Sequence, residues 1–71
     1  MPREAVIHKV NSYELHGVRY YHLFFSYTDA PGSLHEVRLA HDAIYPSPKE
    51  GDRVLVETIL NMVTEIKRKN D

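Results

Sequence analysis

The run from Val18 to Thr28 restricts the fold of this chain more than any other segment. Most of its residues are aromatic, β-branched or aliphatic, and they occupy positions that face both sides of an extended chain. Aromatic and β-branched residues favour strands. A strand that is apolar on both faces is typical of a central strand covered on two sides. The sequence therefore predicts a sheet organised around this run.

Three groups of turn-forming residues divide the rest of the chain. Glycine or proline marks each group, and the groups are His16-Gly17, residues 29–33 and residues 46–52. Ala5–Leu15 precedes the central run, and Leu34–Leu39, in which apolar and charged residues alternate, follows it. Because the connections are short, these segments are predicted to form an antiparallel meander.

Residues 53–68 fit two different structures. At about 100° per residue, most apolar side chains of this segment fall on one face of a helix, and residues 47–50 resemble a capping box before it. Gly51 fits that helix poorly. Alternatively, Gly51-Asp52 is a turn, and the many β-branched residues after it form two strands that pair back through Leu60-Asn61. Ile59 and Leu60 are poor turn residues, and in that hairpin these apolar side chains would need to be covered.

The segment Gly51-Asp52-Arg53-Val54-Leu55-Val56 resembles a pattern of small bacterial β-barrel domains of the Src-homology-3-like or OB-like kind. In those domains a meander is followed by Gly-Asp-x-Val-x-Val and a last short strand. Gly17-Val18-Arg19-Tyr20-Tyr21 and the aromatic strand after it are similar to the same group. As a pattern the resemblance covers residues 5–68. It implies a fold and little about activity, because many such domains have no known function.

We therefore expect a single small domain over residues 1–71 that is mainly β and folds as a five-stranded antiparallel barrel. The alternative is an α+β fold. In that fold a three-stranded antiparallel meander is packed by a C-terminal helix at about residues 53–68.

Composition argues against several classes of function. The chain has no cysteine, which removes disulfides, thiolate metal sites and a cysteine nucleophile. Its net charge of −1 gives no strong electrostatic attraction to nucleic acid or to a membrane surface. No apolar run approaches the roughly 18 residues of a membrane span, and the first residues lack the apolar core of a signal peptide. We expect a cytoplasmic protein without a membrane partner.

The five histidines of the chain show no metal-ligand spacing. If the turn at residues 29–33 pairs Tyr27 with Leu34, then His22 and His41 become diagonal neighbours on adjacent strands, which gives at most a two-ligand surface site. No motif brings a serine together with a histidine and a carboxylate. We expect no metal, no cofactor and no enzyme activity.

Binding is the class of function that remains. A thin sheet domain exposes strand edges and has a small core, and pairing with a second copy or another protein relieves both. We therefore expect a protein-binding or self-association module that uses a sheet surface. The alternative is a binder of single-stranded nucleic acid that stacks bases on sheet aromatics and contacts phosphates with basic side chains. The candidate binding residues are Arg19, Tyr20, Tyr21, His22 and Arg38.

Overall fold

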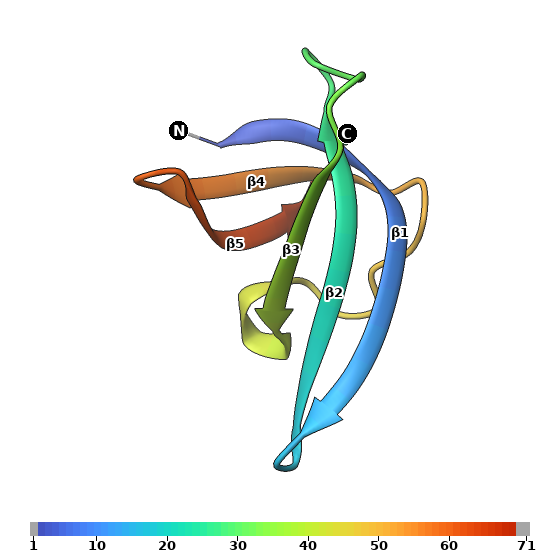
Figure 1. Ribbon diagram of the computed structural model, residues 1–71, viewed down its shortest axis with the longest axis vertical. Coiled ribbons are helices and arrows are strands. Elements are labelled where there is room, and N and C mark those ends of the chain that lie inside the picture. Colours follow the sequence, from blue (N-terminus) through green and yellow to red (C-terminus); the bar gives the residue numbers. More distant parts are fainter. Residues whose placement is uncertain (1, 70–71) are drawn as a thin grey trace.

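Five antiparallel strands make up most of the computed structural model, which describes residues 2–69 (Figure 1). They are β1 (Arg3–Leu15), β2 (Val18–Tyr27), β3 (His35–Ala40), β4 (Arg53–Ile59) and β5 (Met62–Arg68), and a short 3₁₀-helix, η1 (His41–Ala43), follows β3. The order in the sheet is β3-β2-β1-β4-β5. The expected mainly β fold with five antiparallel strands is confirmed. Within residues 2–69, no helix has the length and apolarity that a membrane crossing requires.

Residues 53–68 form a β-hairpin, so the alternative with a C-terminal helix is wrong. Val54, Val56 and Ile66 are almost fully buried, whereas their neighbours in sequence are partly or fully exposed. This is burial with a period of two residues, as in a strand. The β-branched residues of the segment favour that conformation, and Gly51, with φ of +86°, makes the turn that precedes it.

The turn between β4 and β5 is made by two residues with positive φ, Leu60 (52°) and Asn61 (67°). Two-residue hairpin turns of this type favour Asn-Gly, because a leucine at positive φ is strained. Leu60 is also 92% exposed. We expect the double substitution Leu60→Asn and Asn61→Gly to raise the free energy of unfolding by about 1–2 kcal/mol. Urea denaturation measures this change. Leu60→Ala is the control that keeps the strained backbone, and an equal gain from it would contradict the explanation.

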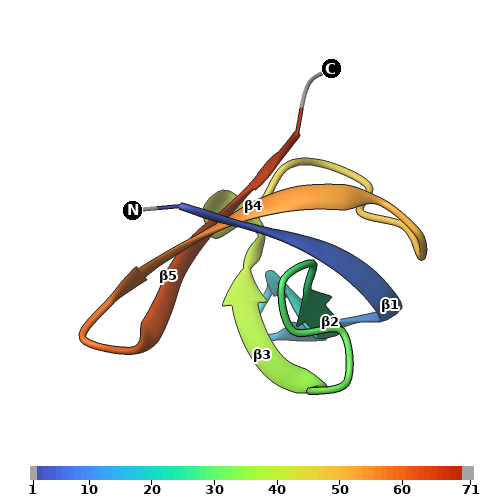
Figure 2. The ribbon, with the colours of Figure 1, turned by 90° about the horizontal axis from the view of Figure 1, so that it is seen from above.

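The sheet curls strongly but does not close into the expected barrel. β3 and β5 remain as its two edges. Within the described residues the two sides of the gap meet in one isolated parallel bridge, between Ile44 and Ile66. The chain leaves β3 through η1 after only six residues, and the β4–β5 hairpin swings away from β2 and β3 (Figure 2). An open cleft therefore separates the first half of β3 from the first half of β5.

The hydrophobic core fills the concave side of the sheet. All five strands contribute to it, together with Ile44 from the segment after η1. Its members are Ala5, Ile7, Leu23, Phe25, Tyr27, Leu39, Ile44, Val54, Val56 and Ile66. Phe25 lies directly opposite Ile7 in the pairing of β1 with β2, and its ring packs edge-on against Tyr27 at a centroid distance of 5.4 Å. The core is thus centred where β1 and β2 meet.

A β-bulge at His8 interrupts the pairing of β1 with β2, whose register shifts between Ile7 and Lys9. Residues 5–15 of β1 pair with β2, and residues 3–6 pair with β4 on the other side. The loop before β4 is fastened at this point. Gly51 N donates a hydrogen bond to Ile7 O at 2.7 Å, and Ile7 N donates to Asp52 O at 3.0 Å. The Gly51-Asp52 motif therefore holds the loop to the sheet.

Candidate functional site

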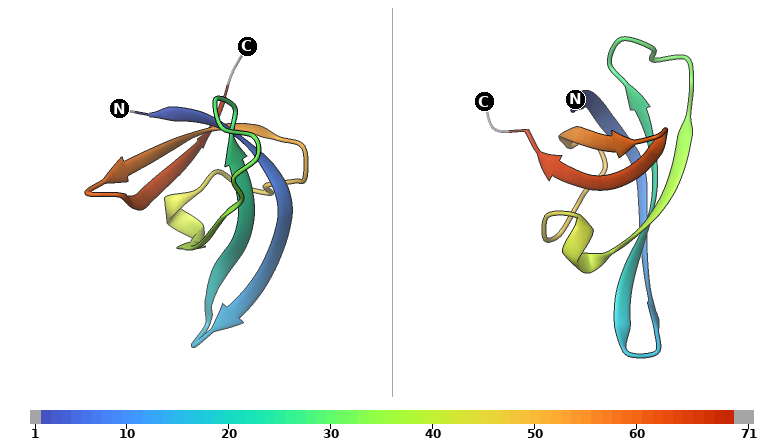
Figure 3. Two further views of the ribbon diagram at one scale, coloured as in Figure 1. Left: turned by 45° about the horizontal axis from the view of Figure 1, so that its top comes forward. Right: turned by 90° about the vertical axis from the view of Figure 1, so that its left-hand side faces the viewer.

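The outer face of the sheet, on the side away from the core, carries a row of aromatic side chains. Side chains alternate along β2, so Leu23 and Phe25 lie in the core while Tyr20, His22 and Phe24 point to the opposite side. These three side chains are only partly buried. In the right-hand view of Figure 3, β4, β5 and η1 all lie on one side of the β1–β2 hairpin. Of the described elements, β3 and the loop before it lie on the other side, where β3 pairs edge to edge with β2.

Tyr13 on β1 extends this row, and we call Tyr13, Tyr20, His22 and Phe24 the aromatic stripe. Tyr13 pairs with Tyr20 across the strands, and their rings stack at a centroid distance of 5.6 Å and an interplanar angle of 17°. The rings of His22 and Phe24 are 4.9 Å apart and tilted. Tyr13 is 40% exposed. Each ring thus has a packed neighbour and still presents apolar surface to solvent.

Charged side chains of both signs border the aromatic stripe. On β1, Lys9 lies opposite Phe24, and on β3, Arg38 lies opposite His22. Glu36 accepts a hydrogen bond from the His22 ring, and this contact forms an ion pair when His22 is protonated. The stripe is therefore flanked by a cation on each side, with one carboxylate held against it.

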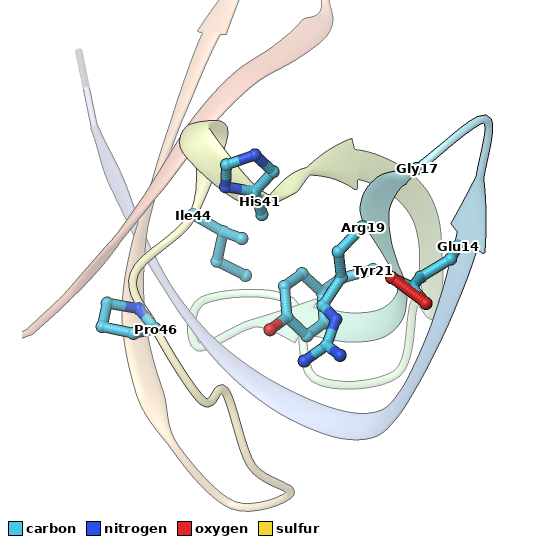
Figure 4. Close-up of a pocket in the computed structure, with 7 residues that line it drawn as sticks. All are labelled: Glu14, Gly17, Arg19, Tyr21, His41, Ile44 and Pro46. Carbon is cyan, nitrogen blue, oxygen red and sulfur yellow. The ribbon is translucent and has the colours of Figure 1, made fainter.

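A second candidate site is a pocket on the opposite, concave side of the β1–β2 hairpin. It has a volume of about 400 Å³ and lies between that hairpin and the segment after β3. Figure 4 shows the Tyr21 ring between the Arg19 side chain and Ile44, with the His41 ring on the other side of the opening. Glu14 lies opposite Arg19 in the strand pairing. The pocket is shallow and is lined by both charges and apolar groups.

The structure divides the five predicted binding residues between these two sites. Tyr20, His22 and Arg38 share the outer face, whereas Arg19 and Tyr21 line the concave pocket. Adjacent residues of a strand face opposite sides, so the five cannot form one surface. Lys9, Tyr13 and Phe24 also lie on the outer face but are not among the five predicted binding residues. A signal for Tyr13 existed, because a two-residue turn at His16-Gly17 places it opposite Tyr20.

The register that would make His22 and His41 diagonal neighbours is not the one observed. β3 is shifted by one residue from the predicted register, so His22 lies opposite Arg38, and Phe25 lies opposite His35. His41 is not in a strand; it begins η1 and borders the concave pocket. A one-residue shift exchanges the two faces of a strand, which separates the two histidines. Among residues 2–69 no group of three or more histidine, aspartate or glutamate side chains is placed to hold a metal ion.

Comparisons with known proteins do not assign the chain to a family. No family model matches it, and neither the curated proteins nor the solved structures gave a significant match. The function of the chain is therefore inferred from its surface chemistry.

Proposed function

We propose that the chain is a non-enzymatic binding module that self-associates through the outer face of β2 and β3. The observation that carries this proposal is the aromatic stripe, which lies on a central strand and has no covering layer from the described residues (Figure 3). A sheet normally buries such a surface, and exposed aromatic patches with a charged border are typical of interaction sites. The surface is convex and offers contact area in place of an enclosed pocket, which favours binding over catalysis.

Mixed charge at the border of the stripe favours a protein partner, most simply a second copy. Lys9 and Arg38 are accompanied by Glu36, so the face does not present one continuous sign of charge. Aromatic residues and arginine are enriched in protein interfaces. We place this activity in the cytoplasm, where a chain without cysteine loses no stability from the reducing conditions.

Replacing two residues of the stripe tests the proposal. We expect the double substitution Tyr20→Ser and Phe24→Ser to weaken self-association by about ten-fold or more, because it removes two aromatic contacts. Sedimentation equilibrium over a wide concentration series measures the association. Leu60→Ser is the matched control, since it removes an exposed apolar side chain from the turn between β4 and β5, which is not part of the stripe. A wild-type chain that stays monomeric at the highest concentration would contradict the proposal.

Single-stranded nucleic acid is the alternative ligand for the same face. The stacked pair Tyr13 and Tyr20 with Lys9 and Arg38 nearby is an arrangement that suits stacked bases and phosphates. Arg19 and Tyr21, which face the concave side, do not belong to this version of the site. A monomer that binds an oligonucleotide with an affinity that falls as salt rises would favour this alternative over self-association.

A further inference from the structure

β3 is an edge strand, and the edge that faces away from β2 is exposed. Among residues 2–69 its sole partner in the sheet is β2, and its residues from His35 to Arg38 are exposed or half-exposed. A shallow hollow of about 230 Å³ is lined by Glu36, Val37 and Arg38. Edge strands present unpaired backbone groups that can accept a further strand. Natural edges are commonly protected by proline, by a bulge or by charged side chains, lysine above all. β3 has no proline, lysine or bulge, and its charged side chains are Glu36 and Arg38.

The charges of β3 are arranged symmetrically about Val37. Glu36 and Arg38 flank this residue and share the outer face, on the same side as the aromatic stripe. If a second β3 lies antiparallel with the two Val37 residues opposite each other, Glu36 of each copy faces Arg38 of the other. Opposite charges in directly opposed positions stabilise a sheet, and like charges destabilise it. This register therefore forms two favourable pairs at once.

Other antiparallel registers lose this match. A shift by two residues in either direction places Glu36 opposite Glu36 or Arg38 opposite Arg38. A shift by one residue exchanges the faces, so that the outer side of one copy adjoins the core side of the other. An unrelated acidic or basic strand would match one of the two charges and oppose the other. The charge pattern therefore selects a second copy of this chain as the occupant of the edge.

We propose that two copies of the chain pair antiparallel through β3, about a two-fold axis at Val37. The first half of β3 borders an open cleft, and β5 diverges from it there (Figure 1). That cleft has a volume of about 340 Å³, and Phe25, Val37 and Val63 are among its lining residues. In the dimer the two outer faces point to the same side, so the aromatic stripes of both copies form one wider surface. This inference rests on the proposal that the chain self-associates, and it places a contact between two copies at the edge of β3, beside the outer face.

Charge reversal followed by charge exchange tests this dimer. Arg38→Glu, or Glu36→Arg, converts both cross-copy pairs into like-charge pairs, and we expect each to weaken dimerisation by about ten-fold. The double variant Glu36→Arg with Arg38→Glu restores opposite pairs and should return the association to near the wild-type value. Sedimentation equilibrium gives the dissociation constants, and circular dichroism checks the fold. Lys67→Glu, an equal change of charge at an exposed position of β5, is the control and should leave the dimer unchanged.

The outcomes separate this inference from the proposed function. Loss in both single variants with recovery in the double variant supports pairing through β3. If the single variants associate like the wild type while Tyr20→Ser with Phe24→Ser dissociates, the edge pairing is overturned and self-association through the outer face stands. If the wild type is monomeric at every concentration, both are overturned.

Discussion

Replacing Phe25 by alanine should leave little folded protein at room temperature. The side chain is 1% exposed, packs edge-on against Tyr27 and stacks on His35 at a centroid distance of 5.5 Å. Removing a buried phenylalanine costs about 3–5 kcal/mol, because apolar contacts are lost and a cavity remains. A domain of this size has about 4–10 kcal/mol of stability in total. The loss is therefore comparable to the whole free energy of unfolding.

Phe24→Ala is the matched control for this experiment. Phe24 is adjacent in sequence but points to the outer face and is only partly buried. We expect its removal to cost less, about 1–2 kcal/mol, because part of its surface is already in contact with water. Urea denaturation followed by circular dichroism measures both variants. Equal losses from the two substitutions would show that both faces of β2 are covered, which contradicts the exposed stripe.

Replacing Asp52 should weaken the domain and remove part of its sensitivity to acid. The Tyr45 hydroxyl donates a hydrogen bond to Asp52 Oδ2 at 2.7 Å, and Lys49 N donates to the same oxygen at 3.0 Å. The hydrogen bond from Tyr45 lowers the pKa of Asp52, and backbone donation from Lys49 adds to the effect. Burial and the same hydrogen bond raise the pKa of Tyr45. We expect Asp52→Ala to cost about 1–3 kcal/mol, since it leaves both donors without this acceptor.

The direction of the pH effect follows from the lowered pKa of Asp52. A carboxyl group whose pKa is lower in the folded chain stabilises the fold above its unfolded pKa. That stability is lost as the pH falls through the folded pKa. Glu4 behaves in the same way, because its hydrogen bond with Lys69 lowers its pKa.

Stability measured as a function of pH separates the two carboxyl groups. We expect Asp52→Asn to flatten the acid limb of the curve, while Glu4→Gln leaves the contribution of Asp52 in place. A Tyr45→Phe variant removes one of the two donors and should shift the acid limb by a smaller amount. An unchanged acid limb in Asp52→Asn would refute the proposed role of this carboxylate.

The strands could be predicted because local preference and pattern agree over most of the chain. β-branched and aromatic residues identified β1, β2 and β3 to within about two residues, consistent with the usual error at strand ends. The β4–β5 hairpin was harder, because Leu60 contradicts the preference of its own turn. There the β-branched residues and the burial of alternate positions, Val54 and Val56, outweighed the unfavourable turn residue.

The site was less predictable than the strands for two physical reasons. Both faces of β2 carry aromatic residues, so the sequence did not show which face enters the core. The register of β3 also depends on the loop from Thr28 to Leu34, and no short turn type determines how many of those residues pair. A shift of one residue there moved His22 away from His41. The sequence also did not show whether the sheet closes into a barrel, because closure depends on how far η1 directs the chain away from β5.

The position of β1 between two partners implies an order of events in folding. β2 follows β1 after a two-residue turn, whereas β4 is separated from β1 by most of the chain. Closing the short loop costs little chain entropy, and closing the long one costs more. The β1–β2 hairpin should therefore form early, and docking of β4 at Ala5 and Val6 should limit the rate. Substitutions at Val54 would then mainly slow folding, and substitutions at Tyr13 would mainly change how fast the hairpin nucleates.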